Sequence, residues 1–342
     1  MSTFTVGIDV SSKTLDVAYA RDKQEATYLG QYTNDESGME RLFQAVKKMA
    51  GEITIHLVME PTGGYEQPLA HQALAWGWQV SLPKPRHVRD WAKSQGRRAK
   101  TDRQDALLLA RYGANHELPT WQPLPAHIAE LDALLDRRTD LEKMLRQERN
   151  RQHALESQGT LTGPVAASIE AAVVWLDAAI VAIDAAIDEH LNQYPDLRKE
   201  AKRLRTVPGI GTGSVLPMLV LLHRWGSLTS FLGTARGLTA YVGLDPKPYQ
   251  SGTSVHRRTG ISRQGAPAIR SRLFMCALGG TRGRNVLRPF YQRLVAAGKP
   301  KKLALIAAAR KILVWAWAVF RDQADFDPML ATGAESASLP VA

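Results

Sequence analysis

Hydrophobic and polar positions alternate along the first 125 residues in two rhythms, one typical of strands and one typical of helices. Short runs of β-forming residues, separated by polar breaks, predict five strands. They cover residues 4–10, 14–20, 25–32, 54–60 and 78–82. Helical spacing lies between them over residues 34–49 and 66–76. This order of elements predicts a mixed α/β sheet with helices packed on it.

Between residues 126 and 194 the pattern changes to long, charged segments of helical spacing. Leucines of the first segment lie on one stripe, and apolar residues of the second repeat at four-three-four spacing. These residues are Leu131, Leu135 and Leu145, then Leu176, Ile180, Ile183 and Ile187. We predict the two arms of an antiparallel coiled coil; two ordinary helices packed on a core are the alternative.

The third part of the chain opens with a glycine-containing turn, Val207-Pro208-Gly209-Ile210-Gly211, before an apolar helix over residues 214–222. The turn resembles the hairpin of a helix-hairpin-helix element, in which Gly209 and Gly211 let backbone N–H groups approach a phosphate. A tight turn without a ligand would explain the same residues. Further helices are predicted over residues 266–278, 287–297 and 303–320, and residues 331–342 are predicted to be a flexible tail.

Charge is distributed unevenly along the 342 residues, whose formal net charge is +11. Residues 201–311 contain 20 lysines and arginines and one acid, Asp245, so this segment carries +19 and the rest of the chain carries −8. A surface kept basic for solubility alone would intersperse both signs. The segment therefore predicts a polyanionic partner, which nucleic acid would satisfy.

Several other classes of protein do not fit the composition. The single Cys276 excludes an intramolecular disulfide framework, and the N-terminal residues lack the basic and apolar regions of a signal peptide. The apolar stretch over residues 303–320 is interrupted by Arg310 and Lys311, which favours a buried or amphipathic helix over a membrane span. We expect a protein of the reducing cytoplasm without a membrane partner.

Four carboxylates are candidates for metal chemistry. Asp9 lies within the first predicted strand, where burial is expensive without a partner, and Glu60 ends the fourth. If these strands are neighbours, the two side chains converge. Asp102 and Asp105 follow at i, i+3 spacing at the start of a predicted helix over residues 101–112. Such an oxygen cage suits Mg²⁺ or Mn²⁺.

Each carboxylate also has a structural explanation. Asp102 would complement the helix dipole beside a Thr101 cap. Asp16 alternates with Leu15 and Val17, so we expect it to point outward into solvent. The occurrence of Glu60, Asp102 and Asp105 together with Asp9 is what favours a metal site.

The motifs around these carboxylates are Gly7-Ile8-Asp9-Val10-Ser11, Glu60-Pro61-Thr62-Gly63-Gly64-Tyr65 and Lys100-Thr101-Asp102-Arg103-Gln104-Asp105-Ala106. They resemble the DEDD family of insertion-sequence transposases, relatives of the Piv-type DNA invertases. Three later motifs resemble the C-terminal transposase domain of that family: Pro208-Gly209-Ile210-Gly211, Gly243-Leu244-Asp245-Pro246 and Tyr249-Gln250-Ser251-Gly252-Thr253-Ser254. The resemblance covers nearly the whole chain.

The resemblance implies a role for each matching position. Its four metal-binding carboxylates fall on Asp9, Glu60, Asp102 and Asp105, and its catalytic serine falls on Ser251. Gln250 departs from relatives that carry an acid there. Basic side chains near the serine would contact phosphate oxygens; they are Lys247, Arg257, Arg258 and Arg263. Without the resemblance, the segment from Ser251 to Ser254 is typical of a flexible polar turn.

The resemblance also implies an architecture and a reaction. A RuvC-like, ribonuclease-H-like domain would cover residues 1–125, a coiled-coil region residues 126–195, and a mainly helical transposase domain residues 196–330. DNA strand exchange would proceed through a covalent phosphoserine at the 5′ phosphate, within a tetramer in which Ser251 comes from a neighbouring subunit. A structured bridge RNA would pair with target and donor DNA in the bacterial cytoplasm, where the protein would be associated with the nucleoid.

Two other classes of function remain open. A Holliday-junction nuclease would use the same carboxylates to activate water, would need no serine, and would form no protein–DNA adduct. A non-enzymatic nucleic-acid-binding protein would need the basic segment but not Asp9, and metal chelation would leave its binding unchanged.

Overall fold

The computed structural model describes residues 3–22, 25–95, 101–229, 233–247, 250–251, 255–256 and 260–333. Its contacts divide the chain into two compact units, Met1–Pro123 and Leu124–Ala342. The predicted coiled-coil region and the predicted transposase domain both lie within the second unit. Each unit is described by itself.

The first unit is built on a five-stranded mixed sheet with strand order β3-β2-β1-β4-β5. The strands are β1 (Thr3–Val10), β2 (Thr14–Arg21), β3 (Thr27–Thr33), β4 (Thr54–Met59) and β5 (Gln79–Ser81). The first three form an antiparallel meander, whereas β4 runs parallel to both β1 and β5. The predicted mixed sheet is therefore confirmed, and the structure places its first and fourth strands next to each other.

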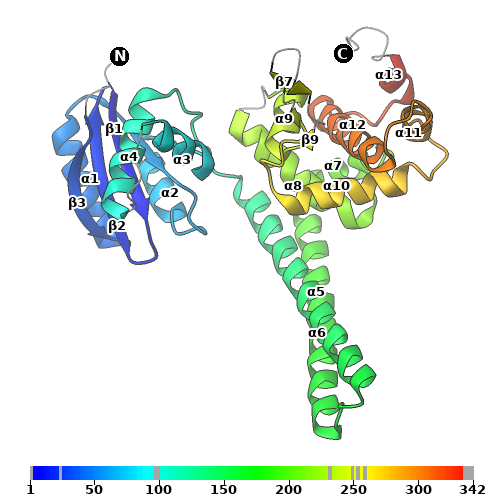
Figure 1. The fold of residues 1–342 in the computed structure, drawn as a ribbon. Coiled ribbons are helices and arrows are strands. Elements are labelled where there is room, and N and C mark those ends of the chain that lie inside the picture. Colours follow the sequence, from blue (N-terminus) through cyan, green and yellow to red (C-terminus); the bar gives the residue numbers. More distant parts are fainter. Residues whose placement is uncertain are drawn as a thin grey trace. The chain divides into compact units, whose positions relative to one another are not determined.

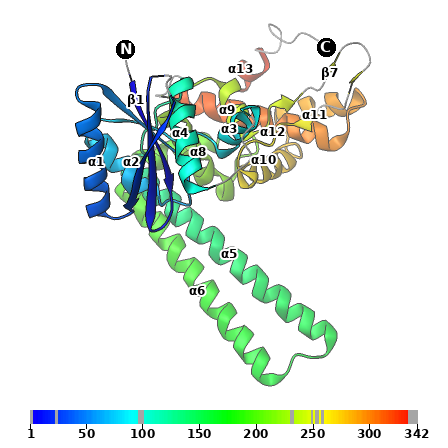
Figure 2. The same cartoon turned by 60° about the vertical axis from the view of Figure 1, so that its left-hand side comes forward.

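Helices cover both faces of this sheet (Figures 1 and 2). Helices α1 (Glu36–Ala50) and α2 (Gln67–Ala75) pack on the face that carries Phe4, Val6 and Ile8. Helices α3 (Pro85–Ser94) and α4 (Asp102–Asn115) pack on the opposite face. The strand periodicity explains this, because alternate residues of β1 point to opposite faces and both faces carry small or apolar side chains.

The second unit begins with a long helical hairpin, α5 (Ala126–Gln158) and α6 (Gly163–Gln193), which Figure 1 shows in green. Leu141, Leu145 and Leu176 form a buried cluster between the helices. Ion pairs Arg138–Asp184 and Arg149–Asp177 join them along their length. The hairpin agrees with the predicted antiparallel pair of helices.

The rest of the second unit packs around the buried helix α12 (Lys301–Asp322). The other helices are α7 (Pro195–Leu204), α8 (Thr212–Thr229), α9 (Ala235–Val242), α10 (Pro267–Gly280), α11 (Leu287–Ala296) and α13 (Pro328–Gly333). Two small antiparallel ladders pair β6 (Pro246–Lys247) with β9 (Gly260–Ile261) and β7 (Gln250–Ser251) with β8 (Val255–His256). The predicted tail largely lies outside the described residues, and its first residues end α13.

Two helices of the described chain, α6 and α12, are long and apolar enough by composition to cross a membrane. The interior of the second unit accounts for α12, since eleven of its residues are buried there. This agrees with the prediction of a buried helix over residues 303–320. Helix α6 buries its own stripe against α5 and carries Asp177 and Asp184 in ion pairs.

Candidate functional site

Asp9 and Glu60 lie side by side at the ends of two neighbouring parallel strands. In the β1–β4 register Ile8 pairs with Met59, so the next position on each strand brings Asp9 beside Glu60. Two residues earlier, Gly7 and Val58 pair and both face helices α3 and α4. Because side chains alternate along a strand, Asp9 and Glu60 point to this same face.

Helix α4 lies against the sheet with almost no side chain between the backbones. A Cβ atom on Gly7 would come within 2.1 Å of the Ala110 nitrogen and 2.5 Å of the Ala106 oxygen. A Cβ atom on Gly113 would come within 2.8 Å of Thr5 Cγ2. The small residues Ala106, Ala110 and Gly113 of α4 therefore determine how closely, and at what position, the helix packs on β1.

The first turn of α4 carries Asp102 and Asp105 to the end of the sheet where Asp9 lies. The helix begins after Thr101, whose hydroxyl accepts a hydrogen bond from the Gln104 N–H at 3.3 Å. Asp102 lies one turn before Ala106, which packs over the sheet, and Asp105 one turn before Leu109, which packs on Val58 of β4. Helical periodicity thus directs both carboxylates toward the strand ends.

The pKa of Asp9 records the proximity of the other three carboxylates. It is raised from 3.8 to about 7, first by burial and then by the negative charges of Asp105, Asp102, Glu60 and Asp16, in that order. Among the described residues, however, no three acidic, histidine or cysteine side chains lie close enough together to hold a metal ion. The carboxylates interact across the site without forming a closed set of ligands.

Asp16 contradicts the prediction of a solvated side chain. It pairs with Asp9 across β1 and β2, and only 5% of its surface is exposed. Its two oxygens accept hydrogen bonds from Tyr28 Oη at 2.6 Å and Gln31 Nε2 at 2.9 Å. Burial and this carboxylate raise the pKa of Tyr28 to about 12, so the phenol stays protonated and donates. The prediction failed because alternation cannot reveal that α4 covers this face.

Glu66 holds the turn that follows Glu60, a role that the sequence motif did not reveal. Its side chain is 3% exposed, and its Oε2 accepts hydrogen bonds from the N–H groups of Thr62 at 2.9 Å and Gly64 at 3.0 Å. Gly63 and Gly64 have φ values of 62° and 98°, which glycine adopts without strain. An acid two residues after the Gly63-Gly64 pair was the available signal in the sequence.

The predicted nucleophile, Ser251, lies in the short strand β7 and pairs with Val255 of β8. The backbone of this ladder is described, but its side chains are not, and Gly252, Thr253 and Ser254 lie outside the described residues. Arg257 and Arg258 also lie outside them. Ser251 belongs to the second unit and the four carboxylates to the first.

Two family models match the chain. A DEDD-type model described as "Transposase" matches residues 6–158, and the model "Transposase IS116/IS110/IS902 family" matches residues 201–292. The chain is 35% identical over 331 residues to the pilin gene-inverting proteins of Moraxella lacunata and Moraxella bovis, covering 96% of this chain and 98% of each relative. The chain belongs to the IS110/IS116/IS902 transposase family.

An insertion-element relative matches part of the chain. The uncharacterized protein of insertion element IS110 from Streptomyces coelicolor is 28% identical over 188 residues, which cover 54% of this chain and 45% of that protein. Family membership makes the protein a transposase that recombines DNA.

In this transposase the predicted helix-hairpin-helix turn joins α7 to α8. Gly209 has φ 96°, and a Cβ atom there would come within 2.5 Å of the Cys276 carbonyl oxygen of α10. Packing therefore requires this glycine irrespective of any ligand. Gly211 lies in open space, and its N–H donates to Ser214 Oγ at 3.0 Å, one half of a helix capping box.

The described basic residues near Ser251 lie on the surface of the transposase. Lys247 of β6 is exposed, as is Arg263, which adopts a φ of 56° after β9. Close to these two residues in sequence, the Ser262 hydroxyl binds the Asp245 carboxylate, and the Ser262 N–H donates to the Asp245 carbonyl at 2.9 Å. These bonds close the base of the segment that carries Ser251.

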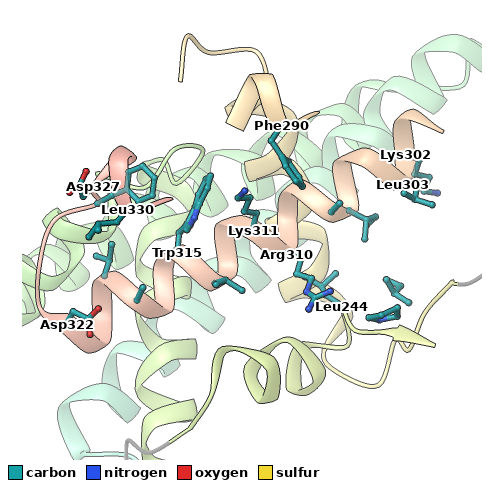
Figure 3. A pocket seen from close by; sticks show the side chains of 18 of the residues that line it. Leu244, Phe290, Lys302, Leu303, Arg310, Lys311, Trp315, Asp322, Asp327 and Leu330 are labelled. Atoms are coloured by element: carbon teal, nitrogen blue, oxygen red, sulfur yellow. The ribbon is translucent and has the colours of Figure 1, made fainter. Parts of the chain in front are cut away.

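A groove of about 1050 Å³ runs along α12 beside this segment (Figure 3). Its lining is mostly apolar and includes Pro246 of β6 and Ile261 of β9. Lys311 Nζ lies 4.4 Å from the ring centre of Phe290 and 5.4 Å from that of Trp315. The groove thus combines aromatic walls with a cation next to the strands that flank Ser251 in sequence.

Proposed function

We propose that this transposase cuts and rejoins DNA with a divalent metal held by Asp9, Glu60, Asp102 and Asp105, and with Ser251 as the nucleophile. Residues 1–125 would be a RuvC-like metal domain, residues 126–195 a coiled-coil region, and residues 196–330 the domain that carries the serine. The convergence of Glu60, Asp102 and Asp105 on Asp9 at one end of the sheet is the observation that carries the proposal.

The donor set fits Mg²⁺ or Mn²⁺. All four side chains offer hard oxygen ligands, and a cation would offset the repulsion that raises the pKa of Asp9. When bound, the metal would supply Lewis-acid neutralisation of the charge that develops on the phosphate. Asp9 must lose its proton to act as a ligand, so metal binding would strengthen as the pH rises through about 7.

The serine would act by covalent catalysis. The Ser251 oxygen would attack the phosphorus, its proton would leave to a base, and the bond to the 3′ oxygen would break, giving a 3′ hydroxyl and a 5′ phosphoserine. Attack of another 3′ hydroxyl on that phosphoserine would restore the phosphodiester and free the serine. No net hydrolysis is required. Exposed Lys247 and Arg263 would position the DNA backbone.

The assembly would be a tetramer that binds target and donor DNA through a structured bridge RNA in the bacterial cytoplasm. The +19 segment supports extensive contact with nucleic acid backbones. Because Ser251 and the carboxylates lie in separate units, the serine of one subunit could complete the metal site of another. The similarity to pilin gene-inverting proteins supports inversion as one outcome of strand exchange.

Covalent trapping of labelled DNA tests the proposal. Wild type should yield a protein-linked strand on denaturing gels, Ser251→Ala should bind DNA without forming one, and Ser254→Ala should keep most of it. Asp105→Asn should abolish cleavage, whereas Asp90→Asn, in exposed ion pairs on α3, should not. A linked strand from Ser251→Ala, or efficient wild-type cleavage without one, would favour a water-activating nuclease.

A further inference from the structure

The hydrogen bonds of Asp16 and the stacking of Arg103 form a polar network beside the four carboxylates, and Asp16, Tyr28 and Gln31 lie outside the family motifs. Asp16 of β2 lies opposite Asp9 of β1, on the sheet face covered by α4. The next residues on this face of β2, Ala18 and Ala20, are small and pack against Ala106 and Ala110 of α4. The network therefore replaces an apolar contact where the sheet meets the first turn of the helix.

Tyr28 connects the sheet to that first turn. Its hydroxyl donates to Asp16 at 2.6 Å, and the Arg103 guanidinium carbon lies 4.7 Å from its ring centre. Arg103 stands between Asp102 and Asp105 in sequence. Gln31 of β3 donates to the other oxygen of Asp16 at 2.9 Å, so the carboxylate is held from two sides.

We propose that Asp16, Tyr28, Gln31 and Arg103 are positioning residues that fix the first turn of α4 relative to β1, and thereby Asp102 and Asp105 relative to Asp9. The inference rests on the proposed metal-binding role of those three carboxylates. Arg103 stacks on Tyr28 of β3, whereas Asp105 lies one turn before Leu109, which packs on Val58 of β4. Holding Arg103 on Tyr28 thus limits rotation of the turn about the helix axis.

The chemistry of the network favours positioning over stability alone. A carboxylate that is 5% exposed and opposite another acid is a costly way to join two strands, because an apolar pair would pack there without desolvating a charge. Fixed hydrogen bonds to a buried carboxylate instead give one defined geometry. Partners around ligating carboxylates commonly change metal affinity by about 10–100-fold when removed.

The test is Mn²⁺ binding to the full-length protein. Binding is measured by calorimetric titration and by the rise in Tm when Mn²⁺ is added. Tyr28→Phe removes only the hydroxyl and keeps the ring under Arg103. Tyr32→Phe is the matched control, because Tyr32 lies on the same strand but packs into the opposite face of the sheet. Arg103→Lys keeps the charge and removes the planar stacking group.

We expect Tyr28→Phe and Arg103→Lys to raise the half-saturating Mn²⁺ concentration about ten-fold, with cleavage recovering at high Mn²⁺ and Tyr32→Phe unchanged. Wild-type Mn²⁺ affinity in both variants, or a fall in metal-free Tm without any change in affinity, would overturn the positioning role. If instead wild type binds no Mn²⁺, or Asp105→Asn binds it normally, the proposed metal site itself fails.

Discussion

Gly7 of β1 lies directly against Ala110 of α4, where a Cβ atom would approach the Ala110 nitrogen to 2.1 Å. Backbone atoms on both sides leave no flexible group that can yield. The helix that carries Asp102 and Asp105 therefore rests on a position where only glycine fits.

Gly7→Ala should displace α4 and destabilise the first unit by about 3 kcal/mol, because the clash is with backbone rather than with a movable side chain. Thermal unfolding and Mn²⁺ binding measure the effect, and both should fall. Gly279→Ala in α10 is the control, since a Cβ atom there meets nothing within 4 Å. An unchanged Tm for Gly7→Ala would contradict the close packing.

Asp9→Asn should raise the Tm of the metal-free protein at pH 8. The folded-state pKa of Asp9 is raised from 3.8 to about 7, so its contribution to stability is complete below pH 3.8 and is lost as the pH rises through about 7. Since Asp9 is only partly buried, solvent screening reduces the gain to about 1 kcal/mol. The advantage over wild type should shrink as the pH falls from about 8 to about 5.

Asp35→Asn is the comparison variant, because the pKa of Asp35 is shifted in the opposite direction to that of Asp9. The N–H of Gly38 and the hydroxyl of Thr33 lower the pKa of Asp35, so its contribution is present above the unfolded pKa and lost at acid pH. This variant should not gain stability at pH 8. Equal behaviour of the two variants would mean that the pKa of Asp9 is not raised in the folded protein.

Glu66→Ala should destabilise the turn after Glu60 by about 2 kcal/mol, because two partly buried hydrogen bonds to a carboxylate are lost. Mn²⁺ binding should weaken as Glu60 loses its fixed position. Glu36→Ala, at the exposed start of α1, should change neither quantity. Thermal unfolding with and without Mn²⁺ separates the two effects, and an unaltered Mn²⁺ affinity in a destabilised Glu66→Ala would limit Glu66 to stability.

Purified protein should carry RNA. The affinity of the protein for nucleic acid should fall steeply as the salt concentration rises. Replacing exposed Lys247 and Arg263 with alanine should weaken binding uniformly across sequences and reduce the salt slope by about one for each lost contact. Lys48→Ala, exposed on α1, is the matched control. If RNase treatment leaves sequence-specific recombination unchanged, the protein recognises its DNA sites without a guide.

Local patterns predicted most elements of the first unit. Period-two and helical spacing are properties of consecutive residues, so the five strands, α1, α2 and α4 could be recognised from the sequence. The same patterns marked Asp9, Glu60, Asp102 and Asp105 by placing acids at strand ends and a helix start. Helices α3, α7, α9 and α13 were not predicted, since they are short and lack a long apolar repeat.

The sequence by itself thus determined which residues form the strands and the α4 helix, because those preferences act between near neighbours. Only the tertiary structure decided that Asp16 is buried, that Gly7 admits α4, and that Glu66 holds the turn after Glu60. Each of these depends on which element covers a given face. Alternation along a strand assigns residues to two faces but does not say what covers each face. Packing of α4, which is distant in sequence, decides that the face with Asp9 and Asp16 carries the candidate site.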